Sequence, residues 1–79
     1  MNFFERRRIE LQLKLGRHFT RRHIAEQLGV TRQAVGVWES GKSAPRLHMV
    51  AKLAKVYRVS ESKMKDVIFE LSSETTAAA

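Results

Sequence analysis

The stretch FTRRHIAEQLGVTRQAVGVWESGKSAP, residues 19–45, decides the fold of this chain. Thr20 and Thr31 are suitable N-cap residues, because a threonine hydroxyl accepts a hydrogen bond from the first turn of a helix. Gly29 and Gly41 follow the apolar positions of the two segments and are suitable residues for a helix end. The stretch therefore predicts two short helices separated by a tight turn that contains glycine. The predicted helices cover residues 21–28 and 32–40.

The rest of the chain also has the composition and the spacing of helices. Strong helix formers dominate it, and apolar residues recur at intervals of three and four. Gly16 is suited to end a first helix, Pro45 marks the start of a fourth, and Ser60 is suited to cap a fifth. These three helices are predicted over residues 3–15, 45–57 and 61–71. We therefore expect an all-α, compact five-helix domain over residues 1–71, followed by a flexible tail over residues 72–79.

Length and composition exclude several classes of protein. A chain of 79 residues has room for one small domain, which excludes the large α/β enzyme folds. The chain has no cysteine for a disulfide framework, and its three histidines lack the spacing of a metal site. No apolar run approaches the roughly 18 residues of a membrane-spanning helix. We therefore expect a cytoplasmic protein with no metal and no cofactor.

Positive charge is concentrated in the first part of the chain. The net charge is +7, from 15 lysines and arginines against 8 aspartates and glutamates. Residues 1–46 contain ten basic and four acidic side chains, a net charge of +6, whereas residues 47–79 contribute only +1. A small domain with one strongly basic part is typical of proteins that bind nucleic acid. The alternative is a basic surface that serves only solubility.

The same central stretch resembles the Cro/lambda-repressor-like family of helix-turn-helix proteins. The matching residues are Thr20, Ile24, Ala25, Gly29, Val30, Thr31, Val35, Trp38, Glu39, Gly41 and Pro45. The resemblance covers about residues 17–66 and implies a lambda-repressor-like DNA-binding domain. It further implies a phage or bacterial transcription regulator of the nucleoid, a repressor, that binds a double-stranded DNA operator as a homodimer.

The sequence departs from the family pattern in several places. Arg21 follows the capping threonine where the family usually has glutamine, and Arg58 stands where the family often has glycine. The segment between the first two helices is longer than usual, which blurs the register of the first helix. The family often has an arginine there that pairs with the glutamate of Trp-Glu, which is Glu39 in this chain. That position falls on Gln12 in one register, with Arg8 one turn earlier, and the sequence leaves the partner of Glu39 open.

The face of the helix over residues 32–40 that lies opposite Val35 and Trp38 is expected to read bases. Its residues are Arg32, Gln33, Gly36 and Val37. Arginine matches the two acceptors of guanine, glutamine matches adenine, and the methyl groups of valine match the methyl group of thymine. A glycine inside a helix costs about 0.5–1 kcal/mol relative to alanine, so a bare backbone at this position favours contact with DNA. The alternative is that the glycine lets two helices pack closely.

Basic and hydroxyl side chains around this helix are expected to contact DNA phosphates. They are Thr20, Arg21, Arg22, Ser40, Lys42 and Arg46, together with main-chain N–H groups of residues 40–42. A cation at the N-terminus of a helix opposes the helix dipole at a cost of roughly 0.3–1 kcal/mol. Arg21, Arg22 and Arg32 all stand at predicted helix starts, which favours contacts with phosphate or base over a role in stability.

The fifth predicted helix is expected to form the dimer interface. The interface residues are Val67, Ile68, Phe69 and Leu71. Phe69 lies roughly 140° around the helix from Met64 at 100° per residue. A helix that is apolar on two sides usually has two partners, here its own domain and a second subunit. The alternative is that Phe69 is an isolated aromatic residue on the surface.

Other functions are compatible with the same fold. Within the family, an antitoxin would also bind a toxin, and a controller protein of a restriction–modification system would activate as well as repress. A module that binds only proteins would use its basic face for an acidic partner. Residues 36–43, GVWESGKS, also fit the phosphate-binding loop of nucleotide-hydrolysing enzymes, but that loop must follow a β-strand. Because a helix is predicted there, the sequence argues against an enzyme.

Overall fold

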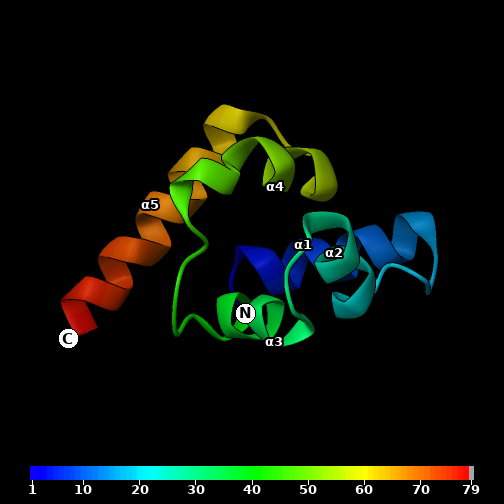
Figure 1. The fold of residues 1–79 in the computed structure, drawn as a ribbon, viewed down its shortest axis with the longest axis horizontal. Helices are drawn as coiled ribbons and strands as arrows, with labels where there is room; N and C mark the ends of the chain where they lie inside the picture. The colour runs from blue at the N-terminus through cyan, green and yellow to red at the C-terminus, as the bar shows by residue number, and fades with distance from the viewer. Residues whose placement is uncertain (79) are drawn as a thin grey trace.

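The computed structural model describes the backbone of residues 1–78 and the side chains of residues 1–73. Its helices are α1 (Phe3–Leu15), α2 (Arg21–Leu28), α3 (Arg32–Ser40), α4 (Val50–Tyr57) and α5 (Glu61–Ala78), with a 3-10 turn over Leu47–Met49. Residues 1–78 contain no β-strand. The helix α3 packs against α1 and α2, and α2 also packs against α4. In Figure 1, α4 lies across the molecule from α3, and α5 runs along one side to the C-terminus. The all-α prediction is confirmed.

The predicted bounds hold for the first three helices, whereas the start of the fourth helix at Pro45 and the end of the fifth at Leu71 were predicted wrongly. Residues 47–49 form a 3-10 turn before α4, and no side chain caps the start of either element. The helix α5 continues to Ala78, so its predicted end at Leu71 is seven residues too early. Residues 72–78 contain neither glycine nor proline, and serine and threonine alone did not stop the helix. Ala79, the last residue of the predicted tail, lies outside the described residues.

Side-chain caps fix the starts of α1, α2, α3 and α5. The hydroxyl oxygens of Thr20, Thr31 and Ser60 accept hydrogen bonds from backbone N–H groups three residues later, at 3.1, 3.1 and 3.0 Å. These caps are as predicted from the sequence. Asn2 caps α1 in the same way, and its side-chain amide donates to the carbonyl oxygen of Trp38 at 2.6 Å. Asn2 thus ties the start of α1 to the end of α3.

An aromatic cluster joins three helices in the core. The rings of Phe4 and Tyr57 have centroids 5.4 Å apart, and those of Phe4 and Trp38 are 6.0 Å apart. Phe4 and Tyr57 are fully buried, and Trp38 is nearly so. Because these residues come from α1, α3 and α4, the cluster fixes α3 against the rest of the domain.

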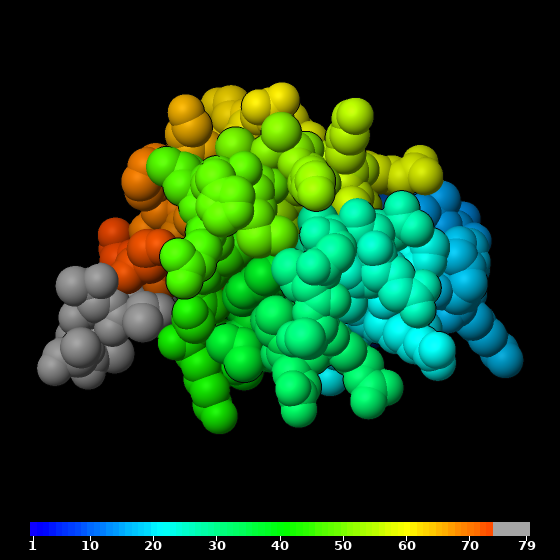
Figure 2. Space-filling view, in the orientation of Figure 1, coloured from blue at the N-terminus to red at the C-terminus, as the bar shows by residue number. Residues whose placement is uncertain are grey.

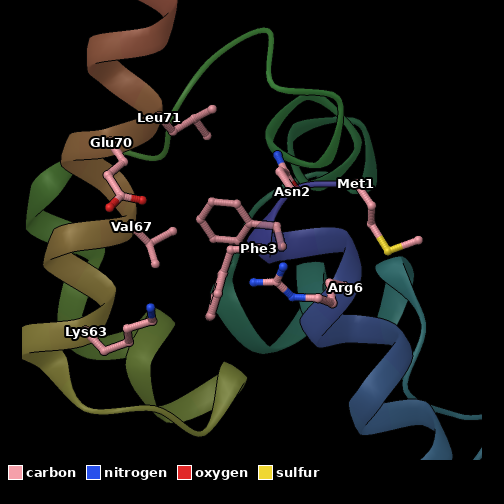
Figure 3. A pocket seen from close by; sticks show the side chains of 9 residues that line it. Met1, Asn2, Phe3, Arg6, Lys63, Val67, Glu70 and Leu71 are labelled. Atoms are coloured by element: carbon pink, nitrogen blue, oxygen red, sulfur yellow. The ribbon is translucent and has the colours of Figure 1, made fainter.

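The apolar stripe of α5 belongs to this core, which corrects three of the four predicted interface residues. Val67, Ile68 and Leu71 are each no more than 6% exposed within the single chain. Figure 3 shows the side chains of Val67 and Leu71 turned toward the start of α1, where Phe3 lies. Phe69 remains 53% exposed. The stripe therefore attaches α5 to its own domain, and of the four residues only Phe69 is exposed.

Arg58 adopts the backbone conformation of the glycine that it replaces. Its φ of 57° and ψ of 50° lie in the left-handed region, where a side chain other than glycine costs energy. Arg7 stabilises this helix end from α1, since its Nε donates to the carbonyl oxygen of Tyr57 at 2.8 Å and its Nη2 to that of Arg58 at 3.0 Å. The end of α4 is thus held by a contact between residues 50 positions apart.

Candidate nucleic-acid interface

The helices α2 and α3 are joined by a turn whose geometry follows from its glycine. Gly29 ends α2 with a φ of 73°, and the N–H of Val30 donates to the carbonyl oxygen of Ala25 at 3.0 Å. A residue other than glycine adopts this φ only with strain. Thr31 then caps α3. The turn places α3 at the edge of the molecule, where Figure 2 shows long side chains of α3 and of the following segment standing out from the surface.

The structure brings the four predicted base-reading residues to one outward face of α3. Arg32 and Gln33 are exposed, and Gly36 and Val37 are half-buried. Arg32 makes no ion pair or side-chain hydrogen bond with the described residues. A Cβ atom built on Gly36 would meet nothing within 4 Å. Close packing of helices within this chain therefore does not explain the glycine.

A shallow depression beside the start of α2 gathers half of the predicted phosphate contacts. We name it the arginine hollow, and its lining residues are Arg8, Gln12, Thr20, Arg21, Arg22 and Arg32. Four of the six lining residues are arginines, which suits an anion. Arg8 and Gln12 were not predicted as site residues, although both were considered as partners of Glu39. Only the tertiary structure brings α1 next to the start of α2.

The other predicted phosphate contacts lie at the opposite end of α3. Lys42 and Arg46 are exposed, and the hydroxyl of Ser40 donates to the carbonyl oxygen of Val37 at 2.8 Å. The expectation for the main-chain N–H groups is corrected at two residues. The N–H of Gly41 donates to Trp38 at 3.1 Å and that of Lys42 to Val37 at 3.3 Å, because they close the end of α3. These two N–H groups are already used within the chain.

Glu39 has two arginine partners. Arg8 donates to its carboxylate twice, from Nε at 2.7 Å and from Nη2 at 3.0 Å. Arg21 donates from Nε at 2.9 Å. The side chain of Glu39 is only 1% exposed, and a buried carboxylate requires such partners. The hydrogen bond to Glu39 raises the pKa of the Arg8 guanidinium, which favours its charged form.

The ion pair gives Arg21 a structural role that the sequence did not show. From the sequence, the three arginines at helix starts are expected to contact phosphate or base rather than to serve stability. Arg21 instead compensates the buried Glu39, and Arg22 forms an exposed pair with Glu26 at 3.3 Å. Of the three arginines, Arg32 alone has no acidic partner among the described residues.

The sequence that fits a phosphate-binding loop does not have the geometry of one. Residues 36–40 are helical and belong to α3, and no strand precedes them in residues 1–78. A phosphate-binding loop connects a strand to the N-terminus of a helix. Residues 36–43 therefore end a helix, and their match to the loop pattern is coincidental.

The fold and this surface define a helix-turn-helix domain, the class that places its second helix in the major groove of DNA. The helix-turn-helix family profile matches residues 9–64, which is more than half of the chain. The chain belongs to this family, and the resemblance deduced from the central stretch is confirmed.

A relative with a known role shares part of this domain. The chain is 39% identical over 49 residues to the HTH-type transcriptional activator BcrR of Enterococcus faecalis. The match covers 62% of this chain and 24% of the relative, so the chain spans about a quarter of that protein's length. No solved structure matches the chain.

The described residues also bear on metal sites and on membrane-spanning helices. No group of three or more His, Cys, Asp or Glu side chains among them is placed to hold a metal ion. None of their helices combines the length and the apolar character needed to cross a membrane.

Proposed function

We propose that this protein is a sequence-specific, double-stranded DNA-binding transcription regulator that reads an operator through the major groove with α3. The observation that carries the proposal is the outward face of α3, where Arg32 and Gln33 are exposed at the start of the second helix of the motif. Residues at that end of the second helix contact base edges in helix-turn-helix complexes. A regulator of this kind works in the nucleoid.

Under this proposal the two groups of basic residues bind the DNA backbone on either side of α3. The arginine hollow takes phosphates near the start of α2, and Lys42 and Arg46 take phosphates beyond the end of α3. Contacts of this kind position the protein without reading sequence, whereas Arg32, Gln33, Gly36 and Val37 supply the base contacts.

The regulator acts as a homodimer in this proposal. One recognition helix reads few base pairs, so two copies on half-sites about 34 Å apart supply the affinity that an operator requires. Phe69 supports the assignment of α5 as the interface, since it is a large apolar side chain that is 53% exposed. The proposed interface on α5 is therefore smaller than the four-residue interface predicted from the sequence.

The direction of regulation has two candidates. The family resemblance favours a repressor, which blocks a promoter by occupying it. The name of the relative BcrR favours an activator, which binds upstream and recruits the polymerase. A reporter gene with the operator placed over the promoter or upstream of it separates the two, because only an activator raises expression from the upstream position.

Selection of bound duplexes from a random pool tests the proposed function. We expect enrichment of one motif arranged as an inverted repeat, in keeping with a two-fold symmetric dimer. A pool that stays random would contradict the proposal and favour the alternative of a module that binds only proteins. Enrichment together with capture of a toxin would favour the antitoxin alternative.

A further inference from the structure

The carboxylate of Glu39 is shared by two guanidinium groups in an almost dry site. It accepts two hydrogen bonds from Arg8, at 2.7 and 3.0 Å, and one from Arg21, at 2.9 Å. One negative charge thus faces two positive charges. Arg8 engages both carboxylate oxygens and is largely buried, with a side chain 15% exposed. The uncompensated positive charge therefore lies on the more exposed Arg21, whose side chain is 47% exposed.

Arg21 faces the arginine hollow with most of its donors unused. A guanidinium has five N–H donors in a planar fork. Of these, the described residues accept only the one on Nε. Both Nη groups remain available, and the bond from Nε to Glu39 fixes the plane in which they lie. A planar fork of this kind matches two oxygens of one phosphate.

Arg22 is the natural comparison, because it is adjacent in sequence and lines the same hollow. It also pairs through Nε with a glutamate, Glu26, at 3.3 Å. Both side chains of that pair are exposed, at 78% and 64%, and an exposed pair does little to order its members. Arg22 must therefore lose conformational freedom when it meets a phosphate, whereas Arg21 is already ordered by a buried partner.

We propose that Glu39 is a positioning residue for DNA: it holds Arg21 so that the Nη fork of Arg21 binds one backbone phosphate. Arg8 keeps the carboxylate in place from the other side. The proposal rests on the DNA-binding function proposed above and adds a device to it, in which a buried acid strengthens the binding of an anion through an arginine.

A pair of double-mutant cycles tests the coupling on the selected operator. In the protein with Glu39, Arg21→Ala is expected to weaken binding about tenfold, as for a hydrogen bond between charged groups. In the Glu39→Gln protein, the same change is expected to cost only about twofold, since the guanidinium is no longer held. The control cycle uses Arg22→Ala and Glu26→Gln, which remove the same charges near the same hollow. There the effect of Arg22→Ala is expected to be equal in both backgrounds.

Two results would overturn the inference. If Arg21→Ala costs the same with and without Glu39, the carboxylate does not position the arginine. If Glu39→Gln tightens binding more than Glu26→Gln does, the carboxylate competes with the phosphate for Arg21. A wild-type protein that selects no DNA sequence would instead contradict the proposed function itself, so the two failures are distinguishable.

A second variant decides the matter if Glu39→Gln does not fold. Arg21→Lys changes a side chain that is 47% exposed and keeps its positive charge, but the ammonium group of lysine lacks the planar fork of a guanidinium. We expect Arg21→Lys to weaken operator binding about fivefold, close to the effect of removing the side chain. Arg17→Lys, at an exposed arginine outside the proposed interface, is expected to leave binding near wild type. Wild-type affinity of the Arg21→Lys protein would overturn the inference.

Discussion

Two arginines show how differently one side chain is used in this domain. Arg32 is exposed at the start of α3 and forms no ion pair with a described residue, as expected of a side chain that binds a ligand. Arg58 is also exposed, but its backbone has a φ of 57° and ends a helix. The role proposed for Arg32 is recognition of DNA, whereas Arg58 affects the stability of the fold. Each role gives a prediction.

Base reading by α3 is tested at Arg32 and Gln33. Each correct bidentate pair with a base is worth about 1–3 kcal/mol of discrimination. We expect Arg32→Ala and Gln33→Ala each to relax sequence preference at particular operator positions while the fold stays intact. Binding-site selection with each variant, together with circular dichroism, measures this. Equal weakening toward every sequence would show that the two residues do not read bases.

The backbone strain at Arg58 is tested by its replacement with glycine. The left-handed conformation costs a residue with a side chain about 1–2 kcal/mol, which glycine avoids. Glycine also loses more conformational entropy on folding, which cancels about 0.5–1 kcal/mol of that gain. We therefore expect Arg58→Gly to raise the free energy of unfolding by roughly 0.5 kcal/mol in urea titrations. Arg58→Ala is the control, since it removes the same charge but keeps the Cβ atom, and an equal gain from alanine would contradict the explanation.

At the scale of elements, the outer face of α3 carries a residue that lowers the stability of the helix. Its inner residues Val35 and Trp38 are buried, whereas Gly36 leaves bare backbone on the outside with open space around it. The loop beyond α3 carries Lys42, an exposed charge beside the helix end. Both features are costly or neutral for folding, and the proposed contact with DNA would explain both.

Replacement of Gly36 by alanine separates folding from binding. The added methyl group meets no atom of this chain within 4 Å, and alanine favours helix by about 0.5–1 kcal/mol. We expect Gly36→Ala to be more stable by about that amount and to bind the operator more weakly, because the methyl group separates α3 from the base edges. Chemical denaturation and DNA titration measure the two effects. Unchanged affinity in the stabilised variant would show that DNA does not approach the helix at this residue.

Phosphate contact beyond α3 is tested at Lys42. Loss of one phosphate contact lowers the salt dependence of binding by about one unit of log K against log salt. We expect Lys42→Ala to weaken specific and random duplexes alike and to show this smaller slope. Lys55→Ala is the matched control, because it removes one lysine from α4, which lies across the molecule from α3. A slope that changes equally in both proteins would show that only net charge matters.

At the scale of the whole molecule, α5 holds the domain together and leaves little apolar surface for a partner. Val67, Ile68 and Leu71 are buried in the core, and Figure 3 shows Val67 and Leu71 turned toward the start of α1, whereas Phe69 is 53% exposed. The proposed dimer therefore depends on Phe69 more heavily than the sequence predicted.

The dimer is tested by Phe69→Lys. A charge at this position is expected to leave a folded monomer, since the side chain is 53% exposed and outside the core. Loss of the second subunit should lower operator affinity by at least about tenfold, because each copy then binds alone. Sedimentation and DNA titration measure both effects. Leu13→Lys places the same charge at another exposed apolar residue, 85% exposed on α1, and should leave the dimer intact. A dimer that survives Phe69→Lys would disprove the interface.

The sequence alone determined the local features of this domain. Thr20, Thr31 and Ser60 cap helices, and glycines end them, because capping and the left-handed conformation depend on residues within one turn. The central motif, the outward face of α3 and the family follow from these local signals at fixed spacing. The end of α5 was predicted wrongly because no glycine or proline marks it.

The tertiary structure decided which distant residues meet. Glu39 joins Arg8 and Arg21, which lie 31 and 18 positions away, and sequence spacing carries no record of such a contact. The same holds for Val67 and Leu71, which are buried and whose side chains turn toward the start of α1. An apolar stripe on a helix indicates that the stripe packs against another surface. The packing of the whole chain decides whether that surface belongs to the same domain or to another copy.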